Sequence, residues 1–281
     1  MKLLITGGRG MLGRTLQREY SDWELSIADL PECDITDAAG FDRFLAAARP
    51  DAVIHCAAMT AVDRCETEPE LAYRLNAAGT ANVASACFRH HIRLIAISTD
   101  YVFRGDLDRP YHEFDRPDPL TVYGITKFAG EEMVRTLCPD HLICRISWLY
   151  GAGGPSFVHS MMKLADGTRP ELKVVADQIG NPTSTTAVAR KLRELLLDPA
   201  LAGTFHLTCE GEASWSEFAG EIFRLAGKQQ TILPCTTAEF PRPAPRPANS
   251  RLEKRMLRLQ GLSPMPHWKD ALTEFMKQET F

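Results

Sequence analysis

A tyrosine and a lysine four residues apart, Tyr123 and Lys127, are the side chains in this sequence best suited to chemistry. Residues i and i+4 share one face of a helix, so the phenol and the ammonium can point into a common cleft. A phenol is a poor acid at neutral pH, and a nearby cation favours its ionised form. The spacing therefore predicts a proton donor tuned by a lysine, although the same spacing also occurs on exposed helices that have no function.

The composition is that of an ordinary globular protein. Its 281 residues are 44% hydrophobic and 24% charged, with 36 Asp and Glu against 32 Lys and Arg. The absence of a basic block argues against a nucleic-acid partner. We see no secretory signal and no apolar span, and we expect a cytoplasmic protein without a membrane partner. The eight cysteines are scattered without a C-x-x-C pair, so we expect reduced thiols and no metal site.

The first strand and the turn after it indicate a dinucleotide site. The apolar run 2–6 predicts a buried strand, and Gly7, Gly10 and Gly13 follow immediately before a helical pattern. In such a turn the first glycine makes the tight bend, the second lets the backbone approach a pyrophosphate, and the third allows the helix to pack on the strand. The pyrophosphate would lie at the helix N-terminus, where unpaired N–H groups point outwards.

The second strand supports this interpretation. The segment 25–28 ends in Asp29, at the distance from the glycines where a carboxylate accepts hydrogen bonds from the adenosine ribose. Further on, Asp34 and Ile35 are placed to flank an adenine ring. The alternative is that Asp29 is a loop carboxylate that caps a local turn.

Strands and helices alternate through the first half of the chain. We expect a strand over 51–58 that ends in small residues, a helix from Glu70 to about His90, and an almost wholly apolar strand over 92–97. This alternation predicts an α/β fold, a Rossmann-type doubly wound parallel sheet whose ligands bind at the C-terminal ends of the strands. The polar run 98–100 lies at that edge, although it is also typical of a turn or a cap.

The second half predicts a smaller α/β substrate domain. We expect a helix over 156–164, a strand over 172–175, a helix to about Leu197, and a strand over 204–208 that returns to the main sheet. A capping box at Ser214 begins another helix. We assign 1–150 to the dinucleotide-binding domain, with 172–208 partly returning to its sheet, and 151–171 and 209–281 to the substrate domain.

A proline-rich segment, 240–247, precedes the last helix. Four prolines in eight residues exclude a helix there. The segment is either a disordered linker or, as we prefer, an ordered loop over the substrate, where Arg242 and Arg246 would meet a diphosphate. The final helix, 265–281, has apolar residues on one side and is expected to pack.

Together these features resemble the extended short-chain dehydrogenase/reductase family, and within it the dTDP-4-dehydrorhamnose reductases. The resemblance covers nearly the whole chain. The stretches that carry it are 60–63, 98–103, 119–127, 145–150, 177–183 and 246–252, the last four of them specific to the subfamily.

The resemblance assigns a role to each site residue. It implies that Thr99 is the catalytic hydroxyl, Tyr123 the acid and Lys127 the tuning cation. The implied substrate contacts are Thr99, Asp100, Tyr101, Trp148 and, from the loop argument, Arg246. The expected cofactor contacts are Gly7, Gly10, Met11, Leu12, Gly13, Asp29, Asp34, Ile35, Ala57, Ala58, Met59, Thr60, Ile97, Tyr123 and Lys127.

The implied reaction is reduction of the C4 ketone of dTDP-4-dehydro-6-deoxy-L-mannose to dTDP-L-rhamnose, a step of polysaccharide biosynthesis. NADH and NADPH both remain open as cofactors, because Asp29 opposes a 2′-phosphate and Arg9 favours one. A nucleotide-sugar epimerase with tightly bound NAD and a non-catalytic regulatory subunit that binds NADP are the alternatives. A dehydratase is disfavoured, since Tyr101 follows Asp100 where a second carboxylate is needed.

The resemblance also bears on assembly. Some bacterial members are similar to metal-bridged dimers that use glutamates, and this chain has Thr15 and Thr186 at the matching positions. We therefore expect no metal bridge, and a monomer or a homodimer.

Overall fold

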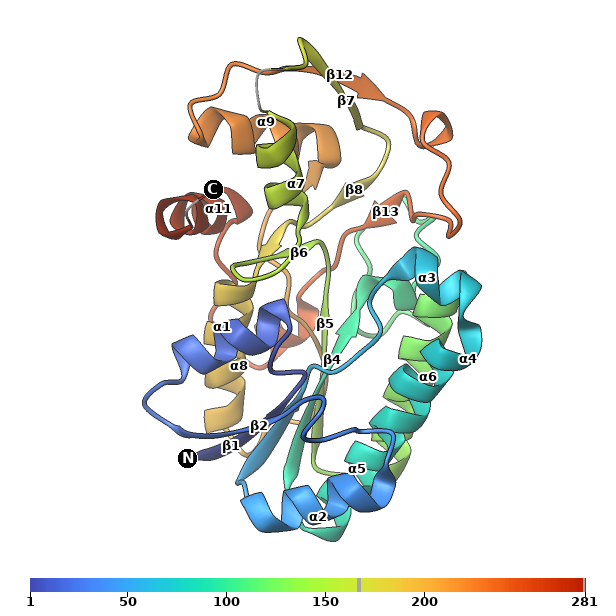
Figure 1. Ribbon diagram of the computed structural model, residues 1–281, viewed down its shortest axis with the longest axis vertical. Coiled ribbons are helices and arrows are strands. Elements are labelled where there is room, and N and C mark those ends of the chain that lie inside the picture. The colour runs from blue at the N-terminus through green and yellow to red at the C-terminus, as the bar shows by residue number, and fades with distance from the viewer. Residues whose placement is uncertain (166–167, 280) are drawn as a thin grey trace.

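The central element of the molecule is a parallel sheet with helices on both faces (Figure 1). The computed structural model describes residues 1–165, 168–279 and 281. Within these ranges six strands pair in the order β10-β5-β4-β3-β1-β2, all parallel to their neighbours. They are β1 (Lys2–Thr6), β2 (Glu24–Ala28), β3 (Ala52–His55), β4 (Arg93–Thr99), β5 (His141–Ile146) and β10 (Gly203–His206).

Two hydrophobic cores lie on opposite faces of this sheet. Leu3 and Ile5 of β1 belong to one core and Leu4 to the other, because successive side chains of a strand point to opposite faces. The first core is covered by α1 (Met11–Glu19) and α8 (Thr185–Leu197). The second is covered by α2 (Ala38–Ala48), α5 (Thr80–Arg89) and α6 (Val122–Leu137). The predicted Rossmann-type doubly wound fold is confirmed.

The strand order reverses between β1 and β3, the two central strands from which the chain winds in opposite directions. Gly7 follows β1 and Ala57 follows β3, so the glycine turn and the small residues lie side by side at this switch point. In doubly wound sheets ligands bind in the crevice at such a point, beyond the carboxyl ends of the strands.

The helix predicted from Glu70 to His90 is interrupted. After the short helices α3 (Val62–Thr67) and α4 (Pro69–Tyr73), a π-helical segment spans Arg74–Gly79 and leads into α5. Within it, the Asn76 side chain accepts from Met59 N at 2.8 Å and donates to Met59 O at 3.1 Å. The widened turn thus places a buried amide that fixes the backbone after β3, a position typical of π-helical turns near functional sites.

The remaining elements form a smaller part beside the sheet. Its helices are α7 (Phe157–Leu164), α9 (Trp215–Leu225) and α11 (Trp268–Gln278), whereas the short helix α10 (Arg255–Leu259) contacts β10 of the central sheet. Its short strands are β6 (Leu149–Tyr150), β7 (Glu171–Val175), β8 (Ile179–Gly180), β9 (Thr183–Ser184), β11 (Ala213–Ser214), β12 (Thr231–Cys235) and β13 (Asn249–Ser250). Because β7 pairs with β12 and only β10 joins the central sheet, 171–175 belongs with this smaller part. The domain boundaries drawn from the sequence stay a prediction.

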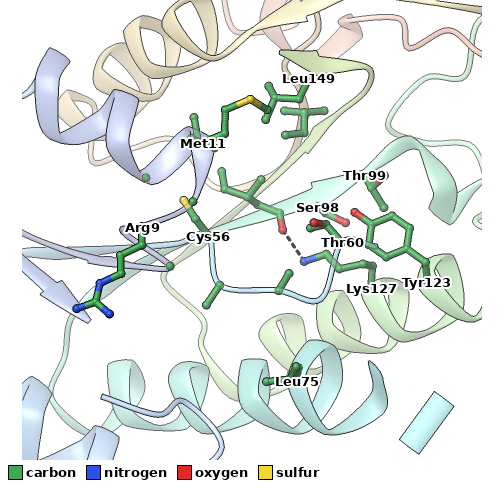
Figure 2. A pocket seen from close by; sticks show the side chains of 18 of the residues that line it. Arg9, Met11, Cys56, Thr60, Leu75, Ser98, Thr99, Tyr123, Lys127 and Leu149 are labelled. Carbon is green, nitrogen blue, oxygen red and sulfur yellow. Dashed lines mark hydrogen bonds between the residues drawn. The ribbon is translucent and has the colours of Figure 1, made fainter. Parts of the chain in front are cut away.

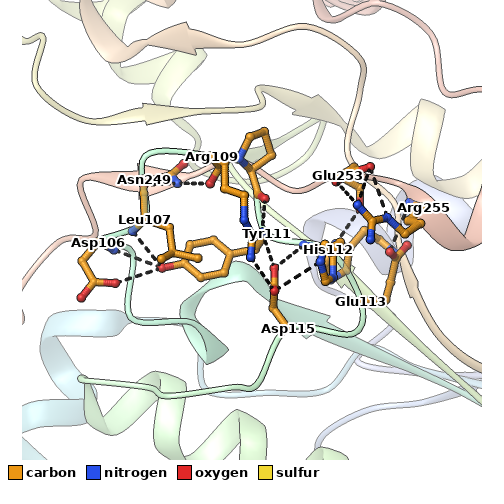
Figure 3. A network of polar contacts seen from close by, with 12 residues as sticks. Asp106, Leu107, Arg109, Tyr111, His112, Glu113, Asp115, Asn249, Glu253 and Arg255 are labelled. Atoms are coloured by element: carbon orange, nitrogen blue, oxygen red, sulfur yellow. Dashed lines mark hydrogen bonds and ion pairs between the residues drawn. The ribbon is translucent and has the colours of Figure 1, made fainter.

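A polar network connects the loop after β4 with the chain before α10 (Figure 3). The Tyr111 hydroxyl accepts from the backbone N–H groups of Gly105, Asp106 and Leu107 at 3.0, 3.1 and 3.3 Å. The Asn249 amide donates to Leu107 O at 2.7 Å and also to the carbonyl of Arg109. This network holds β13 against the loop that follows β4.

The structure also bears on the cysteines, on membrane-spanning helices and on metal sites. All eight cysteines are free thiols, as predicted. In the described part of the chain, no helix is both long and apolar enough to cross a bilayer. Within the same residues, no cluster of three or more His, Cys, Asp or Glu side chains is arranged to hold a metal ion.

Candidate active site

A cavity of about 670 Å³ lies at the switch point of the sheet (Figure 2). Its walls come from the glycine turn, the ends of β2, β3 and β4, and the first turns of α6. It contains nearly all of the predicted cofactor contacts. Those that line it are Gly7, Gly10, Met11, Leu12, Gly13, Asp29, Asp34, Ile35, Ala57, Ala58, Thr60, Ile97, Tyr123 and Lys127.

One predicted cofactor contact, Met59, is not among the described residues that line the cavity. Its side chain is 7% exposed and packs with Cys65, Ala72 and Tyr123 instead. The Asn76 side chain forms hydrogen bonds with both the backbone N–H and the carbonyl of Met59. The role of Met59 as a cofactor contact stays a prediction. In the structure Met59 packs in one apolar cluster with Tyr123.

The glycine turn fits a dinucleotide. Gly7 has φ +67°, and a Cβ there would lie 2.7 Å from Ala57 N. A Cβ on Gly13 would lie 2.4 Å from the Gly7 carbonyl oxygen. Helix α1 begins after Gly10 without a side-chain cap, so its first N–H groups point into the cavity mouth. Bare backbone donors at a helix N-terminus are the arrangement that binds pyrophosphate.

The adenosine end of the cavity carries charges of both signs. Asp29 accepts the backbone N–H of Arg9 at 2.7 Å and that of Leu30 at 2.8 Å, which fixes its carboxylate at the end of β2. The Arg9 guanidinium pairs with Glu32 at 3.0 Å and also donates to the Leu30 carbonyl. A cation is therefore present where a 2′-phosphate would lie, next to a carboxylate suited to a ribose hydroxyl.

The catalytic candidates meet at the inner end of the cavity. Thr121 caps α6 by accepting from Gly124 N at 3.0 Å, and this start places Tyr123 and Lys127 on the buried face of the helix. Figure 2 shows the Tyr123 ring beside Thr99, the last residue of β4. Lys127 Nζ donates to the Ile97 carbonyl at 2.8 Å. The three residues predicted to act together lie together.

Burial sets the protonation of this pair. It raises the pKa of Tyr123 above its usual value, with a contribution from Asp100, while the hydrogen bond with Thr99 opposes the rise. Burial also lowers the pKa of Lys127 to about 8. The prediction that Lys127 lowers the phenol pKa is wrong for this structure, because loss of solvent dominates and the ammonium is bound to a carbonyl. Tyr123 is a neutral phenol at pH 7 and carries the proton that a general acid needs.

Asp100, next to Thr99, is an unusual carboxylate. It is 5% exposed, and burial raises its pKa to about 6 against the opposing hydrogen bonds from Ser250 and Thr99. Thr99 Oγ1 donates to its Oδ1 at 3.0 Å. Its Oδ2 has no hydrogen-bond partner among the described residues. A buried acceptor of this kind is suited to a hydroxyl of a bound ligand.

A second hollow, also about 670 Å³, opens beside the first. The two share Asp100, Tyr101 and Trp148 in their walls. Trp148 has φ +46° and stacks on Trp215 with ring centroids 3.5 Å apart and planes 9° apart. A stacked indole pair of this kind provides a flat apolar wall.

The proline-rich loop forms part of this second hollow. Arg246 lines it, donates to Asp63 at 2.8 Å and to the Ala244 carbonyl at 3.0 Å. Arg242 and Lys173 also line the hollow. The loop lines the hollow, and one end of the Arg246 guanidinium is already bound to Asp63. The preferred interpretation, an ordered loop over the substrate, stays a prediction.

Sequence reasoning missed much of the lining of the second hollow. Phe157, Gln178 and Trp215 all contribute to it, from segments far apart in the chain. Trp215 directly follows Ser214, whose capping role was predicted and is confirmed. No local pattern marks Trp215 as a site residue, because an aromatic residue at the first helical position is usually a packing residue.

Comparisons with known proteins agree with this geometry. The sequence model of the RmlD substrate binding domain matches residues 1–281. The chain belongs to the RmlD family, that of the dTDP-4-dehydrorhamnose reductases. A dTDP-4-dehydrorhamnose reductase of Streptomyces griseus is 42% identical, with 96% of this chain and 91% of that protein covered.

Two solved structures of the RmlD family are also similar. The dTDP-4-dehydrorhamnose reductase of Clostridium acetobutylicum has a TM-score of 0.96 at 44% identity, with 99% of both chains covered. That of Bacillus anthracis, in complex with NADP, has a TM-score of 0.96 at 41% identity, again with 99% of both covered. Family membership therefore extends over both the cofactor cavity and the second hollow.

The positions at which some RmlD-family proteins were expected to carry bridging glutamates are threonines with local partners. Thr15 Oγ1 donates to Thr185 Oγ1 at 2.8 Å, and Arg18 donates to Thr186 Oγ1 at 3.1 Å. Neither hydroxyl is a favoured ligand for a divalent cation. The expectation of no metal bridge stays a prediction.

Proposed function

We propose that this protein reduces the C4 ketone of dTDP-4-dehydro-6-deoxy-L-mannose to dTDP-L-rhamnose with NADPH or NADH. The observation that carries the proposal is the position of Thr99, Tyr123 and Asp100. All three line the dinucleotide cavity, and Asp100 also lines the second hollow, so the reacting groups lie where the two spaces meet. A sugar nucleotide in the second hollow would bring its sugar to this junction.

The side chains suit carbonyl reduction. A bound reduced nicotinamide supplies a hydride to the carbonyl carbon. Tyr123, neutral at pH 7 because burial raises its pKa, gives its proton to the oxygen as negative charge develops there. Thr99, whose hydroxyl donates to Asp100 Oδ1 in this structure, would turn that hydrogen toward the same oxygen, and Lys127 would hold the nicotinamide ribose. Asp100, with one oxygen unpartnered, accepts from a hydroxyl of the sugar.

The second hollow is suited to the nucleotide part of the substrate. Arg242, Arg246 and Lys173 give it a cationic side for a diphosphate, and the stacked Trp148 and Trp215 give it an aromatic wall. We include in the same proposal a cytoplasmic location, a monomer or homodimer, and no nucleic-acid or membrane partner.

The test is a coupled measurement on the purified chain. The 4-keto sugar nucleotide and NADPH, or NADH, are mixed with the protein, and loss of nicotinamide absorbance is compared with the amount of dTDP-L-rhamnose resolved by chromatography. We expect one cofactor oxidised for each product formed. Conversion of a sugar nucleotide without net cofactor consumption would support the epimerase alternative and overturn the proposal, as would the absence of any conversion.

A further inference from the structure

A buried carboxylate, Glu131, lies one helical turn beyond Lys127 and outside both large hollows. It is 3% exposed, and four donors satisfy its two oxygens. Ser98 donates at 2.6 Å, Arg145 donates twice at 2.8 and 2.7 Å, and Arg135 donates at 2.8 Å. Burial alone would raise the pKa of Glu131, but Arg145 and the other donors outweigh it, so the group is ionised.

Glu131 and Lys127 line the same small cavity. It has a volume of about 10 Å³, roughly the space of one water molecule, and its walls include Lys127, Glu131, His55 and Thr80. Lys127 Nζ uses one of its three donors on the Ile97 carbonyl. Lys127 therefore lines both the cofactor cavity and the small cavity that Glu131 also lines.

Lys127 needs a nearby anion to stay charged. It is 7% exposed, and its burial is the main cause of its lowered pKa, while Glu131 is the largest influence that raises it. The Arg145 guanidinium on β5 is held by the same carboxylate. Glu131 therefore both attracts the Lys127 charge and neutralises the cation behind it.

Asp100, at the end of β4, is a second carboxylate that lines the cofactor cavity with Lys127, and its charge acts on Tyr123 by raising the pKa of that phenol. The other titratable groups considered around Lys127 are not anions. Burial lowers the pKa of His55 on β3 to about 3 and raises that of Cys56 to about 12, so both are neutral near pH 7. Tyr123 on the same helix is a neutral phenol, and His206 on β10 is neutral because burial holds its pKa well below the usual value. Arg135 adds only positive charge.

We propose that Glu131, one helical turn from Lys127 and lining the same small cavity, is a positioning residue for the reductase whose buried charge holds Lys127 as an ammonium ion near neutral pH. The ammonium form has three donors, enough for the Ile97 carbonyl and two hydroxyls of the nicotinamide ribose, whereas the neutral amine has only two and carries no charge. This inference rests on the proposed function, because it takes Lys127 to be a cofactor ligand.

The test measures cofactor binding without the sugar. The dissociation constant of NADPH is determined from nicotinamide fluorescence between pH 6 and 10 for the full-length protein. We expect weaker binding as Lys127 loses its proton at high pH. In Glu131→Gln this weakening should begin at least about one pH unit lower, which makes binding on the alkaline side about tenfold weaker than in the original protein. Glu131→Asp, which keeps the charge, should restore most of the alkaline range.

Two further variants serve as controls. Glu131→Gln leaves Arg145 buried without its partner, so the double variant Glu131→Gln/Arg145→Met is measured beside it, and should show a smaller shift in the same direction. Arg135→Gln, which removes a cation on the outer side of Glu131, should leave the profile within a few tenths of a pH unit of the original.

The outcomes separate the two hypotheses. Lys127→Met should abolish the pH-dependent weakening of NADPH binding. If the weakening persists in this variant, Lys127 does not bind the cofactor, and both proposals are overturned. If Lys127→Met abolishes it but the folded Glu131 variants keep the original profile, the positioning role of Glu131 is overturned and the proposed function is not.

Discussion

At the scale of single residues, burial decides what each reactive group does. Tyr123 and Lys127 have the types and spacing expected of a proton donor and a cation, yet burial moves both toward their neutral forms. The sequence contains the spacing but not the extent of burial, which depends on residues far away in the chain. The residues of the site were therefore predictable, whereas their protonation was not.

Asp100 gives a prediction about stability. Its folded pKa of about 6 lies above its ordinary value of 3.8, so the folded protein binds the proton more tightly than the unfolded chain. Ionisation of Asp100 therefore does not lower the free energy of unfolding below pH 4. Above pH 6 it lowers that free energy by its full amount, about 3 kcal/mol at most. Asp100→Asn should raise the free energy of unfolding at pH 8, and the gain should shrink between pH 6 and 4. Urea titrations at pH 4.5 and 8 check this, and an equal effect at both would contradict it.

At the scale of elements, the strands and the catalytic helix followed from the sequence, but the local backbone did not. The apolar runs predicted β1 and β4, and the polar residues at the end of β4 lie at the site as expected. The π-helical turn at Arg74–Gly79 was missed, because its cause is a contact of Asn76 with Met59 and Thr126 from distant segments. Periodicity reports only neighbours along the helix.

The N-cap of α6 links helix stability to catalysis. Thr121→Ala removes the acceptor for Gly124 N and should lower the free energy of unfolding by about 1 kcal/mol. Tyr123 lies in the first turn of α6, so loosening this turn should lower kcat. The affinity for NADPH should change little, because the glycine turn also contributes to NADPH binding. Thr121→Ser keeps the hydroxyl and serves as the control in both urea unfolding and steady-state assays. A loss of kcat in Thr121→Ser as large as in Thr121→Ala would rule out the cap as the cause.

At the scale of the whole molecule, the active site exists because two hollows share one wall. The glycine turn could be found from the sequence alone, since its residues are adjacent. The second hollow draws on Phe157, Gln178, Trp215 and Arg246, which lie far apart in the sequence. Pairings between short strands that are distant in the chain, such as β7 with β12 and β8 with β13, leave no periodic pattern to detect.

The network around Tyr111 tests how the two parts are held together. Tyr111→Phe leaves three backbone N–H groups without the hydroxyl acceptor in a position only 4% exposed. We expect a loss of about 1–3 kcal/mol in the free energy of unfolding. The matched control is Tyr73→Phe, at a position that is 44% exposed, which should change stability by less than about 0.5 kcal/mol. Equal stabilities of the two variants would show that the network does not stabilise the fold.

The most direct test of the account is a single-turnover measurement on Tyr123→Phe. The variant, loaded with NADPH, is mixed with the 4-keto sugar nucleotide, and oxidation of the nicotinamide is followed by absorbance, while NADPH affinity is measured separately by fluorescence. We predict that oxidation slows by about 10²–10⁴-fold because the proton donor is lost, with NADPH affinity unchanged within about threefold. Oxidation at the original rate in a variant that binds NADPH normally would contradict the account.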